Sequence, residues 1–446
     1  MCERLNVAMY GTRDAALAWE KHYSTFLESL GFRKSIGCQN AFYHEARAIR
    51  IIVHGDDFIT GGPETEIQKF KEEMSKKYEA KHQIMGPGRD HSKKINVLNR
   101  EIEWHQRKIT MEADSKHVKA VIKELGLEHA KVMGTPGVKD RHEKVQQEKE
   151  KHMQERYEVE RDNDTSAIAK ERRKLKNTVD EAHVDDSIGT ECPNLEVEVD
   201  GRATEELNHK IKPEEYRKCN EKESRMYRSI VMKLNYLAMD RPEVQWSVRR
   251  CAKNMSSPNT EDLERLKRIG RYLKGKPRVR NVMLFRLNRE DITVKTDSDW
   301  AGKEDGRRSV SGGTIYVCGQ WVQSWSKDQT KVARSSGEAE LYACNLGASK
   351  GLGLQTVMKE LGWNYELRIQ VDANATIGTL HRRGLEKLRH VEVEELWLQQ
   401  EISKKKLSVT KIKGTENTAD IGTKALKKEA VEYLMQKMHF DTLPSV

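Results

Sequence analysis

The sequence predicts an α/β protein whose last third contains a mixed β-sheet, preceded by a smaller α+β region and a charged, disordered insert. From residue 292 onward, three strand-like segments precede a long helix and then alternating strands and helices, an order typical of an α/β layer. Residues 1–138 alternate helical and strand-like patterns. Residues 139–224 are densely charged and contain two aromatic residues, so they cannot bury enough apolar surface to offset their conformational entropy.

The first region is expected to begin with a helix at 15–32, where apolar residues recur at helical spacing. Two strands follow, at 41–46 and 49–54. The tripeptide Gly55-Asp56-Asp57 is expected to form a hairpin turn after the second strand. The pattern then predicts, in order, an amphipathic helix at 64–80, two short strands within 95–112 and a helix at 115–125.

Ordered structure is expected to resume after the insert. Two helices are predicted within 226–275, with a break at Asp240-Arg241-Pro242. The last region should contain, in order, a strand from 292, a hairpin at 313–326, a long helix at 336–361, a strand at 368–371, further helices, a strand at 407–412 and a closing helix. The expected divisions are a first region at 1–138, the charged insert at 139–224, a helical connection at 225–290, a mixed-sheet domain at 291–428 and a C-terminal tail at 429–446.

Composition restricts the class of protein and its compartment. The 446 residues have a net charge of +10, which favours a polyanionic partner because Lys and Arg displace counterions from phosphates; a soluble basic protein would look the same. None of the seven cysteines forms a C-x-x-C pair, a pattern typical of free thiols in a reducing compartment. Neither a membrane span nor a signal peptide is visible in the sequence. We therefore expect a cytoplasmic or nuclear protein without a membrane partner.

Four acidic residues fall at the edges of predicted elements in the last region. Asp297 and Asp372 close two strands, Glu340 lies on the first turns of the long helix, and Asp420 lies at the predicted start of the last helix. Hard cations prefer carboxylate oxygens, and two Mg²⁺ ions ~4 Å apart can cleave a phosphodiester. Strand-end aspartates are also ordinary turn residues, and an aspartate at a helix N-terminus is favoured by the helix dipole.

Glu338 competes with Glu340 for a place in such a site. Ser335 and Glu338 fit a capping box, with the serine as N-cap and the glutamate reaching back to it. Residues two apart on a helix point to different faces. The sequence therefore predicts that Glu338 caps the helix and that Glu340 faces the proposed metal site.

Five segments occur in this order: TDSDWAGKEDGRRSVSGG, QSWSKDQTKVARSSGEAELYA, VDANATIG, RHVEVEELWLQQEI and ENTADIGTKAL. Together they resemble the RNase H domain of copia-type retrotransposon Pol polyproteins, over residues 292–428. The resemblance implies an RNase H-like mixed-sheet fold. It also implies that the four metal carboxylates of that family correspond to Asp297, Glu340, Asp372 and Asp420.

Segments nearer the N-terminus extend the resemblance to the reverse transcriptase of the same family. AMYGTRDAALAWEKHYSTFLESLGF is similar to the helix that follows the polymerase fingers, and VHGDDFITGG is similar to the palm turn. Asp56 and Asp57 would then match the paired aspartates of the polymerase site, although Gly-Asp-Asp is also a common hairpin turn. The third aspartate and the fingers would precede the first residue. Residues 1–138 are therefore expected to be a palm/thumb remnant of a truncated reverse transcriptase, without polymerase activity alone.

The resemblance implies an endoribonuclease that hydrolyses the RNA strand of RNA–DNA hybrids with two Mg²⁺ or Mn²⁺ ions. Its expected partners are nucleic acid and other parts of the Pol polyprotein. Five basic residues near the proposed site are candidates for phosphate contacts, or form a solvated hairpin edge: Arg307, Arg308, Lys327, Lys331 and Arg334. Two alternatives stay open, namely RNA-directed DNA polymerase activity when the missing N-terminal part is supplied, and a catalytically silent nucleic-acid-binding remnant.

Overall fold

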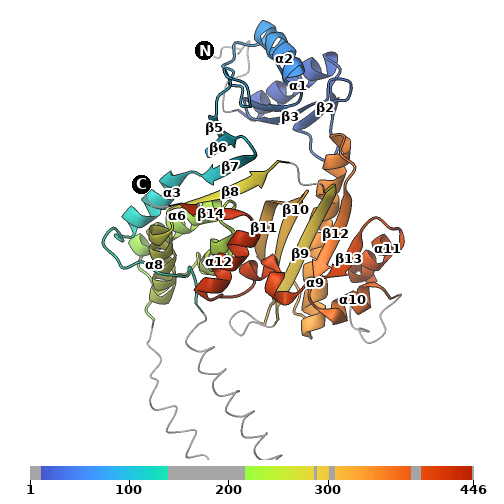
Figure 1. Ribbon diagram of the computed structural model, residues 1–446. Helices are drawn as coiled ribbons and strands as arrows, with labels where there is room; N and C mark the ends of the chain where they lie inside the picture. Colours follow the sequence, from blue (N-terminus) through green and yellow to red (C-terminus); the bar gives the residue numbers. More distant parts are fainter. Residues whose placement is uncertain (1–11, 139–215, 286–288, 301–306, 383–392, 444–446) are drawn as a thin grey trace, which may run out of the picture. The chain divides into compact units, whose positions relative to one another are not determined.

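The computed structural model describes residues 12–138, 216–285, 289–300, 307–382 and 393–443 (Figure 1). The chain divides into two units, one formed by Met1–Gly137 with Cys219–Val446 and the other by Val138–Lys218. The disorder expected at 139–224 falls mostly outside the described residues. The last residues of that range are helical, because α6 (Glu221–Ala238) starts with a capping box between Asn220 and Glu223. The predicted end of the insert is therefore wrong by a few residues.

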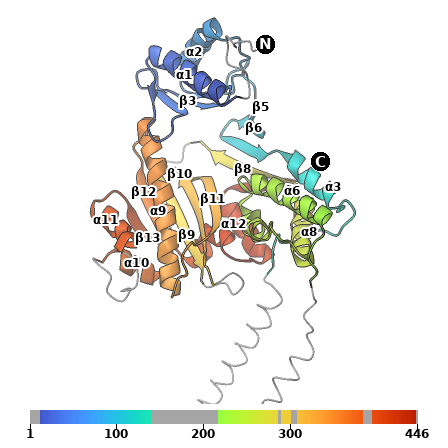
Figure 2. The same cartoon turned by 180° about the vertical axis from the view of Figure 1, so that it is seen from behind.

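Helices α1 (Arg13–Ser29) and α2 (Glu64–Lys77) pack on one face of a four-stranded antiparallel sheet (Figures 1 and 2). In spatial order the strands are β1 (Arg33–Lys34), β2 (Ala41–His44), β3 (Ile49–His54) and β4 (Asp57–Gly61). Alternate residues of β3 enter the core shared with the helices, namely Ile49, Ile51 and Val53. The predicted helices, strands and hairpin of this segment are confirmed.

A second antiparallel sheet combines segments that are far apart in the chain. Its strands, in spatial order, are β14 (Phe440–Leu443), β8 (Arg278–Leu284), β7 (Lys108–Ala113), β6 (Arg100–His105) and β5 (Lys94–Val97). The buried carboxylate of Glu112 on β7 joins β8 to its neighbour, since the Nε atoms of Arg278 and Arg280 lie 2.6 and 2.9 Å from it. Charge-assisted bonds of this length are among the stronger hydrogen bonds in proteins.

This sheet corrects three predictions. Residues 94–113 form three strands instead of two, and the helical connection at 225–290 ends in strand β8. The C-terminal tail at 429–446 contains most of α12 (Lys428–Lys437) and strand β14. These short strands acquire their structure by pairing with distant partners, and such pairing leaves a weak local pattern in the sequence.

Helices α3 (Ser115–Glu124), α6, α7 (Gln245–Lys253) and α8 (Thr260–Gly275) share one apolar core. Residues 226–275 contain three α-helices, whereas two were predicted. The expected break at Pro242 is present as a 3₁₀ turn, η1 (Pro242–Val244), because proline favours the first turn of a helix. A second break precedes α8, where Asn259 and Asp262 form a capping box.

The last region forms a mixed sheet with the spatial order β11-β10-β9-β12-β13. The strands are β9 (Asp291–Asp299), β10 (Val310–Val317), β11 (Gln320–Asp328), β12 (Glu366–Val371) and β13 (Ser408–Lys411). Strand β10 pairs with β9 on one side and β11 on the other, and both pairings are antiparallel. Strand β12 pairs in parallel with both β9 and β13. Helix α9 (Ser336–Glu360) covers one face and contacts β9, β10 and β12 (Figure 1). The predicted mixed sheet is confirmed.

Shorter elements complete this region. They are α10 (Asn374–Leu380), η2 (Val393–Leu396), α11 (Trp397–Ser403), η3 (Gly414–Glu416) and η4 (Thr418–Gly422). None of the helices in the described ranges is long and apolar enough to cross a membrane.

The 3₁₀ turn η4 lies directly on the mixed sheet. A Cβ atom at Gly312 would be 2.7 Å from the carbonyl oxygen of Ala419, and one at Gly422 would be 2.6 Å from that of Trp325. Only glycine permits this close approach of two backbones. The Nδ2 atom of Asn417 also donates to the carbonyl oxygen of Thr296 on β9, at 2.9 Å. These contacts fix the position of η4 beside the end of β9.

Candidate metal centre

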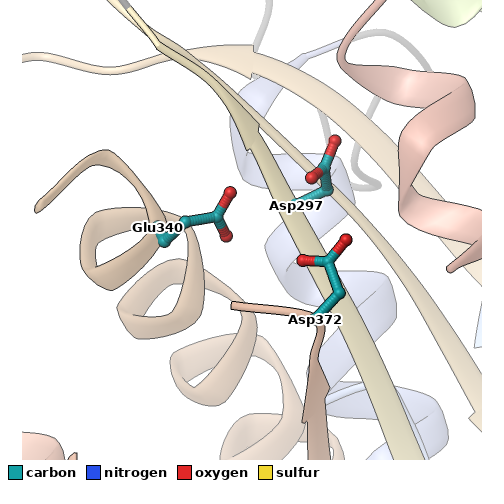
Figure 3. Close-up of side chains that lie close together, drawn as sticks. All are labelled: Asp297, Glu340 and Asp372. Atoms are coloured by element: carbon teal, nitrogen blue, oxygen red, sulfur yellow. The ribbon is translucent and has the colours of Figure 1, made fainter. Parts of the chain in front are cut away.

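Three carboxylates from separate segments converge where strands β9 and β12 of the mixed sheet end (Figure 3). Asp297 lies near the end of β9, Asp372 follows β12, and Glu340 is on the first turns of α9. One carboxylate oxygen from each lies within 4.8 Å of the others. The parallel strands β9 and β12 pair Lys295 with Gln370, two residues before each aspartate. Because of this register, the two strands bring their aspartates to the same edge.

Burial and mutual repulsion disfavour ionisation of these carboxyl groups. Burial raises the pKa of Asp297, and burial together with the charge of Asp297 raises the pKa of Glu340 to about 8. The Oε1 atom of Glu340 accepts hydrogen bonds from the backbone nitrogen and the hydroxyl of Ser298, at 3.1 and 3.0 Å. Its buried Oε2 atom has no hydrogen-bond partner among the described residues. A buried carboxylate oxygen without a partner needs a proton or a cation, so the donor set fits a divalent ion.

Asp420 lies on η4, close to Asp297 but outside the group of three carboxylates whose oxygens lie within 4.8 Å of one another. The sequence placed Asp420 at the start of the last helix, but α12 begins only at Lys428. That position is wrong because η4 is held on the sheet by tertiary contacts. The Nζ atom of Lys424 lies 2.9 Å from Asp420 Oδ2 and 3.7 Å from Asp297 Oδ2. Burial and the charge of Asp297 raise the pKa of Asp420 to about 7, so the two acids interact electrostatically.

Glu338 and Glu340 have different surroundings on α9. The Oγ atom of Ser335 accepts a hydrogen bond from the backbone nitrogen of Glu338, at 3.2 Å, as expected for an N-cap. The Glu338 carboxylate does not return to the serine. It accepts from the backbone nitrogen of Arg334 at 2.9 Å and from the hydroxyl of Tyr342 at 2.7 Å. The reciprocal half of the predicted capping box is therefore wrong, because Tyr342, one turn along the same face, holds the carboxylate. Glu340 belongs to the carboxylate cluster, and Glu338 does not.

Replacing Glu338 with Ala should lower the free energy of unfolding by ~1–3 kcal/mol, because it removes the acceptor of two partly buried hydrogen bonds. The affinity for Mn²⁺ should stay unchanged. Urea unfolding measures the first quantity and calorimetric titration the second. Glu340→Ala is the matched variant, two residues away on the same helix, and should lose Mn²⁺ affinity instead. Equal loss of Mn²⁺ affinity in both variants would contradict the separation of roles.

Residues 1–139 match the family described as reverse transcriptase (RNA-dependent DNA polymerase). The Pol polyprotein of transposon RE1 from Arabidopsis thaliana is 30% identical over 222 residues, which are 49% of this chain and 15% of that protein. The Pol polyprotein of transposon TNT 1-94 from Nicotiana tabacum is 23% identical over 439 residues, 96% of this chain and 27% of that protein. This chain is therefore similar to the Pol polyproteins of copia-type retrotransposons. It spans a minor part of these relatives.

Solved structures of RNase H1 resemble part of this chain. LC11-RNase H1, isolated from compost, is 18% identical and matches 33% of this chain and 99% of its own, with a TM-score of 0.23. RNase H1 from Halobacterium salinarum is 14% identical and matches 32% of this chain and 98% of its own, with a TM-score of 0.22.

The two aspartates compared with a polymerase site, Asp56 and Asp57, lie on the β3–β4 hairpin. Asp57 is the first residue of β4 and pairs with His54, and both Asp56 and Asp57 are exposed. The indole nitrogen of Trp19 donates to the carbonyl oxygen of Gly55 at 2.8 Å, which fixes the turn against α1. Within the described part of the chain, no further His, Cys, Asp or Glu completes a metal-binding group with them.

The five basic residues proposed for phosphate contacts lie around the start of β10 and the end of β11. Arg307, Arg308, Lys327 and Arg334 are exposed. Lys331 forms an ion pair with Glu395 at 2.8 Å. Lys327 and Lys331 line a cavity of about 150 Å³ that also includes Tyr342. Most of these charges are therefore exposed to solvent, where a phosphate could reach them.

Sequence reasoning missed three residues that contact the carboxylates. Ser298 donates to Glu340, the hydroxyl of Thr423 donates to Asp297, and Lys424 forms ion pairs with Asp297 and Asp420. Ser298 directly follows a predicted ligand, and Lys424 is four residues after another. Proximity in sequence was therefore the available signal for both, whereas Thr423 reaches Asp297 only through the packing of η4.

Proposed function

We propose that the RNase H-like part of this chain hydrolyses the RNA strand of RNA–DNA hybrids, with two Mg²⁺ or Mn²⁺ ions bound by Asp297, Glu340, Asp372 and Asp420. The observation that carries this proposal is the convergence of Asp297, Glu340 and Asp372 within 4.8 Å. Buried oxygens of Glu340 and Asp420 without hydrogen-bond partners support it. The similarity of the chain to Pol polyproteins of retrotransposons supports this proposal.

The residues of the chain would bind the metal ions and orient the carboxylates that hold them. Divalent ions, when bound, would activate a water for in-line attack on the scissile phosphate and stabilise the leaving 3′ oxygen. Ser298 orients the Glu340 carboxylate, and Thr423 orients that of Asp297. Because the carboxylates come from three rigid elements and η4, little reorganisation is needed before reaction.

Selection of the hybrid would depend on its shape. An A-like duplex has a wide, shallow minor groove that exposes 2′-hydroxyls, so it can be recognised without reading bases. The exposed residues Arg307, Arg308, Lys327 and Arg334, together with Lys331, would contact phosphates and position the duplex. These contacts should make binding decrease with salt concentration.

A substrate panel tests the proposal. The purified protein with Mg²⁺ should degrade the RNA of an RNA–DNA hybrid and leave duplex DNA, duplex RNA and single-stranded RNA intact, and EDTA should stop the reaction. Binding of the hybrid without cleavage in Mg²⁺ or Mn²⁺ would instead favour a silent nucleic-acid-binding protein. Equal cleavage of all four substrates would contradict the assigned specificity.

A further inference from the structure

Among the described residues, Lys424 is the one whose ammonium group bridges Asp297, a member of the carboxylate cluster, and the neighbouring Asp420. It follows η4 in the chain, and its Nζ atom is 2.9 Å from Asp420 Oδ2 and 3.7 Å from Asp297 Oδ2. Its side chain is nevertheless 42% exposed. The ammonium group thus contacts the cluster while the side chain keeps a route to solvent.

We propose that Lys424 is an exchangeable internal cation, which competes with a divalent ion for Asp297 and Asp420 until a phosphate of the nucleic acid draws it away. This inference rests on the proposed function of the same site. A carboxylate oxygen that accepts from an ammonium group is less available as a metal ligand, and an ammonium and a divalent ion this close repel each other. In the absence of nucleic acid, Lys424 therefore weakens ion binding on the Asp420 side of the cluster.

The position of η4 does not depend on Lys424. The Nδ2 atom of Asn417 donates to the carbonyl oxygen of Thr296 at 2.9 Å, and its Oδ1 atom accepts from the backbone nitrogen of Ala419 at 3.2 Å. Thr423 donates both to the carboxylate of Asp297 and, at 3.2 Å, to the carbonyl oxygen of Asp420. These bonds hold the acids in place, so the distinct contribution of Lys424 is a mobile positive charge.

The lysine can leave because its ammonium group sits on a flexible four-carbon stem. A phosphate close to the cluster offers it a new partner and removes a competing charge from the carboxylates. Nucleic-acid binding should then raise the affinity for the divalent ion, and by linkage the ion should raise the affinity for nucleic acid by the same factor. The site would thereby stay weakly loaded with metal until substrate is present.

Mn²⁺ titration of Lys424→Met tests the proposal without any turnover. The full chain is titrated calorimetrically, alone and with a saturating hybrid whose RNA strand is 2′-O-methylated and resists cleavage. Alone, Lys424→Met should bind Mn²⁺ at least ~10-fold more tightly than the wild type, because one nearby positive charge has been removed. The hybrid should strengthen Mn²⁺ binding in the wild type and do so much less in the variant.

Lys427→Met is the matched control. It removes a lysine three residues away that is exposed and makes no side-chain cap bond at the start of α12, so it should titrate like the wild type. Lys424→Gln repeats the test with a polar side chain in case the methionine variant does not fold. Unchanged or weaker Mn²⁺ affinity in both Lys424 variants would overturn the role of the lysine, while Asp297-dependent Mn²⁺ binding would still support the metal site. Absence of Mn²⁺ binding in the wild type and all variants would overturn both.

Discussion

Asp297→Asn and Asp372→Asn should each abolish Mg²⁺-dependent cleavage of an RNA–DNA hybrid. Each change replaces an anionic ligand with a neutral amide in a cluster whose oxygens lie within 4.8 Å of one another. A loss of at least ~10³-fold in rate is expected, which corresponds to about 4 kcal/mol of transition-state stabilisation. Single-turnover cleavage of a labelled hybrid, at saturating enzyme, measures the chemical step directly.

Asp299→Asn provides the matched control for this experiment. Asp299 lies on the same strand, two residues beyond Asp297, but it is exposed and outside the carboxylate cluster. The control should retain cleavage within a few-fold of the wild-type rate. Retention of wild-type cleavage in Asp297→Asn, or an equal loss in Asp299→Asn, would show that the cluster does not carry the reaction.

In EDTA, the free energy of unfolding should decrease as the pH rises from about 5 to 8. The pKa values of Glu340 and Asp420 are raised to about 8 and about 7 by burial and by the charge of Asp297. The folded protein therefore binds protons more tightly than the unfolded chain. The stability that these two groups contribute is fully present below the ordinary carboxyl pKa values and is lost as the pH rises through the raised ones. The loss should be on the order of 3 kcal/mol, measured by urea unfolding across this range.

Glu340→Gln separates this effect from the titration of other groups. The variant cannot ionise at position 340, so its stability in EDTA should depend less on pH and should exceed that of the wild type at pH 8. Adding Mg²⁺ at pH 8 should stabilise the wild type, because the ion binds the folded state, and should have little effect on the variant. Parallel pH profiles for the two proteins would show that the buried carboxylates do not control the stability.

The position of the cluster was predictable where one local element determined it. Strand-end positions indicated Asp297 and Asp372, and the different faces of one helix separated Glu340 from Glu338. The position of Asp420 in the structure was not predictable in the same way. Its segment, η4, is held by close backbone contacts of Gly312 and Gly422 with distant parts of the chain. Contacts of this kind involve residues far apart in the chain and have no local periodicity. The metal-binding role of these residues stays a prediction until ions are titrated.

The strands of the fold were likewise predictable where a local pattern marks them, and not where distant contacts determine them. The mixed sheet was predicted because its strands carry strong apolar runs, and Ile292, Val294 and Ile369 are fully buried. Strand β8 was missed because its anchors are the charge pairs of Arg278 and Arg280 with Glu112, on a strand that lies much earlier in the sequence. A polar strand stabilised by distant charges resembles a loop when only neighbouring residues are considered.

The sheet that joins β5, β6 and β7 to β8 and β14 has a consequence for the biogenesis of the protein. Its first three strands end at Ala113, whereas β8 begins at Arg278 and the outermost strand, β14, begins at Phe440. Because pairing over such long separations carries a large loop-closure cost, it slows folding. Completion of this sheet is therefore expected late in folding, and cutting the chain between Leu284 and Asp291 would leave the two products with complementary unpaired strand edges.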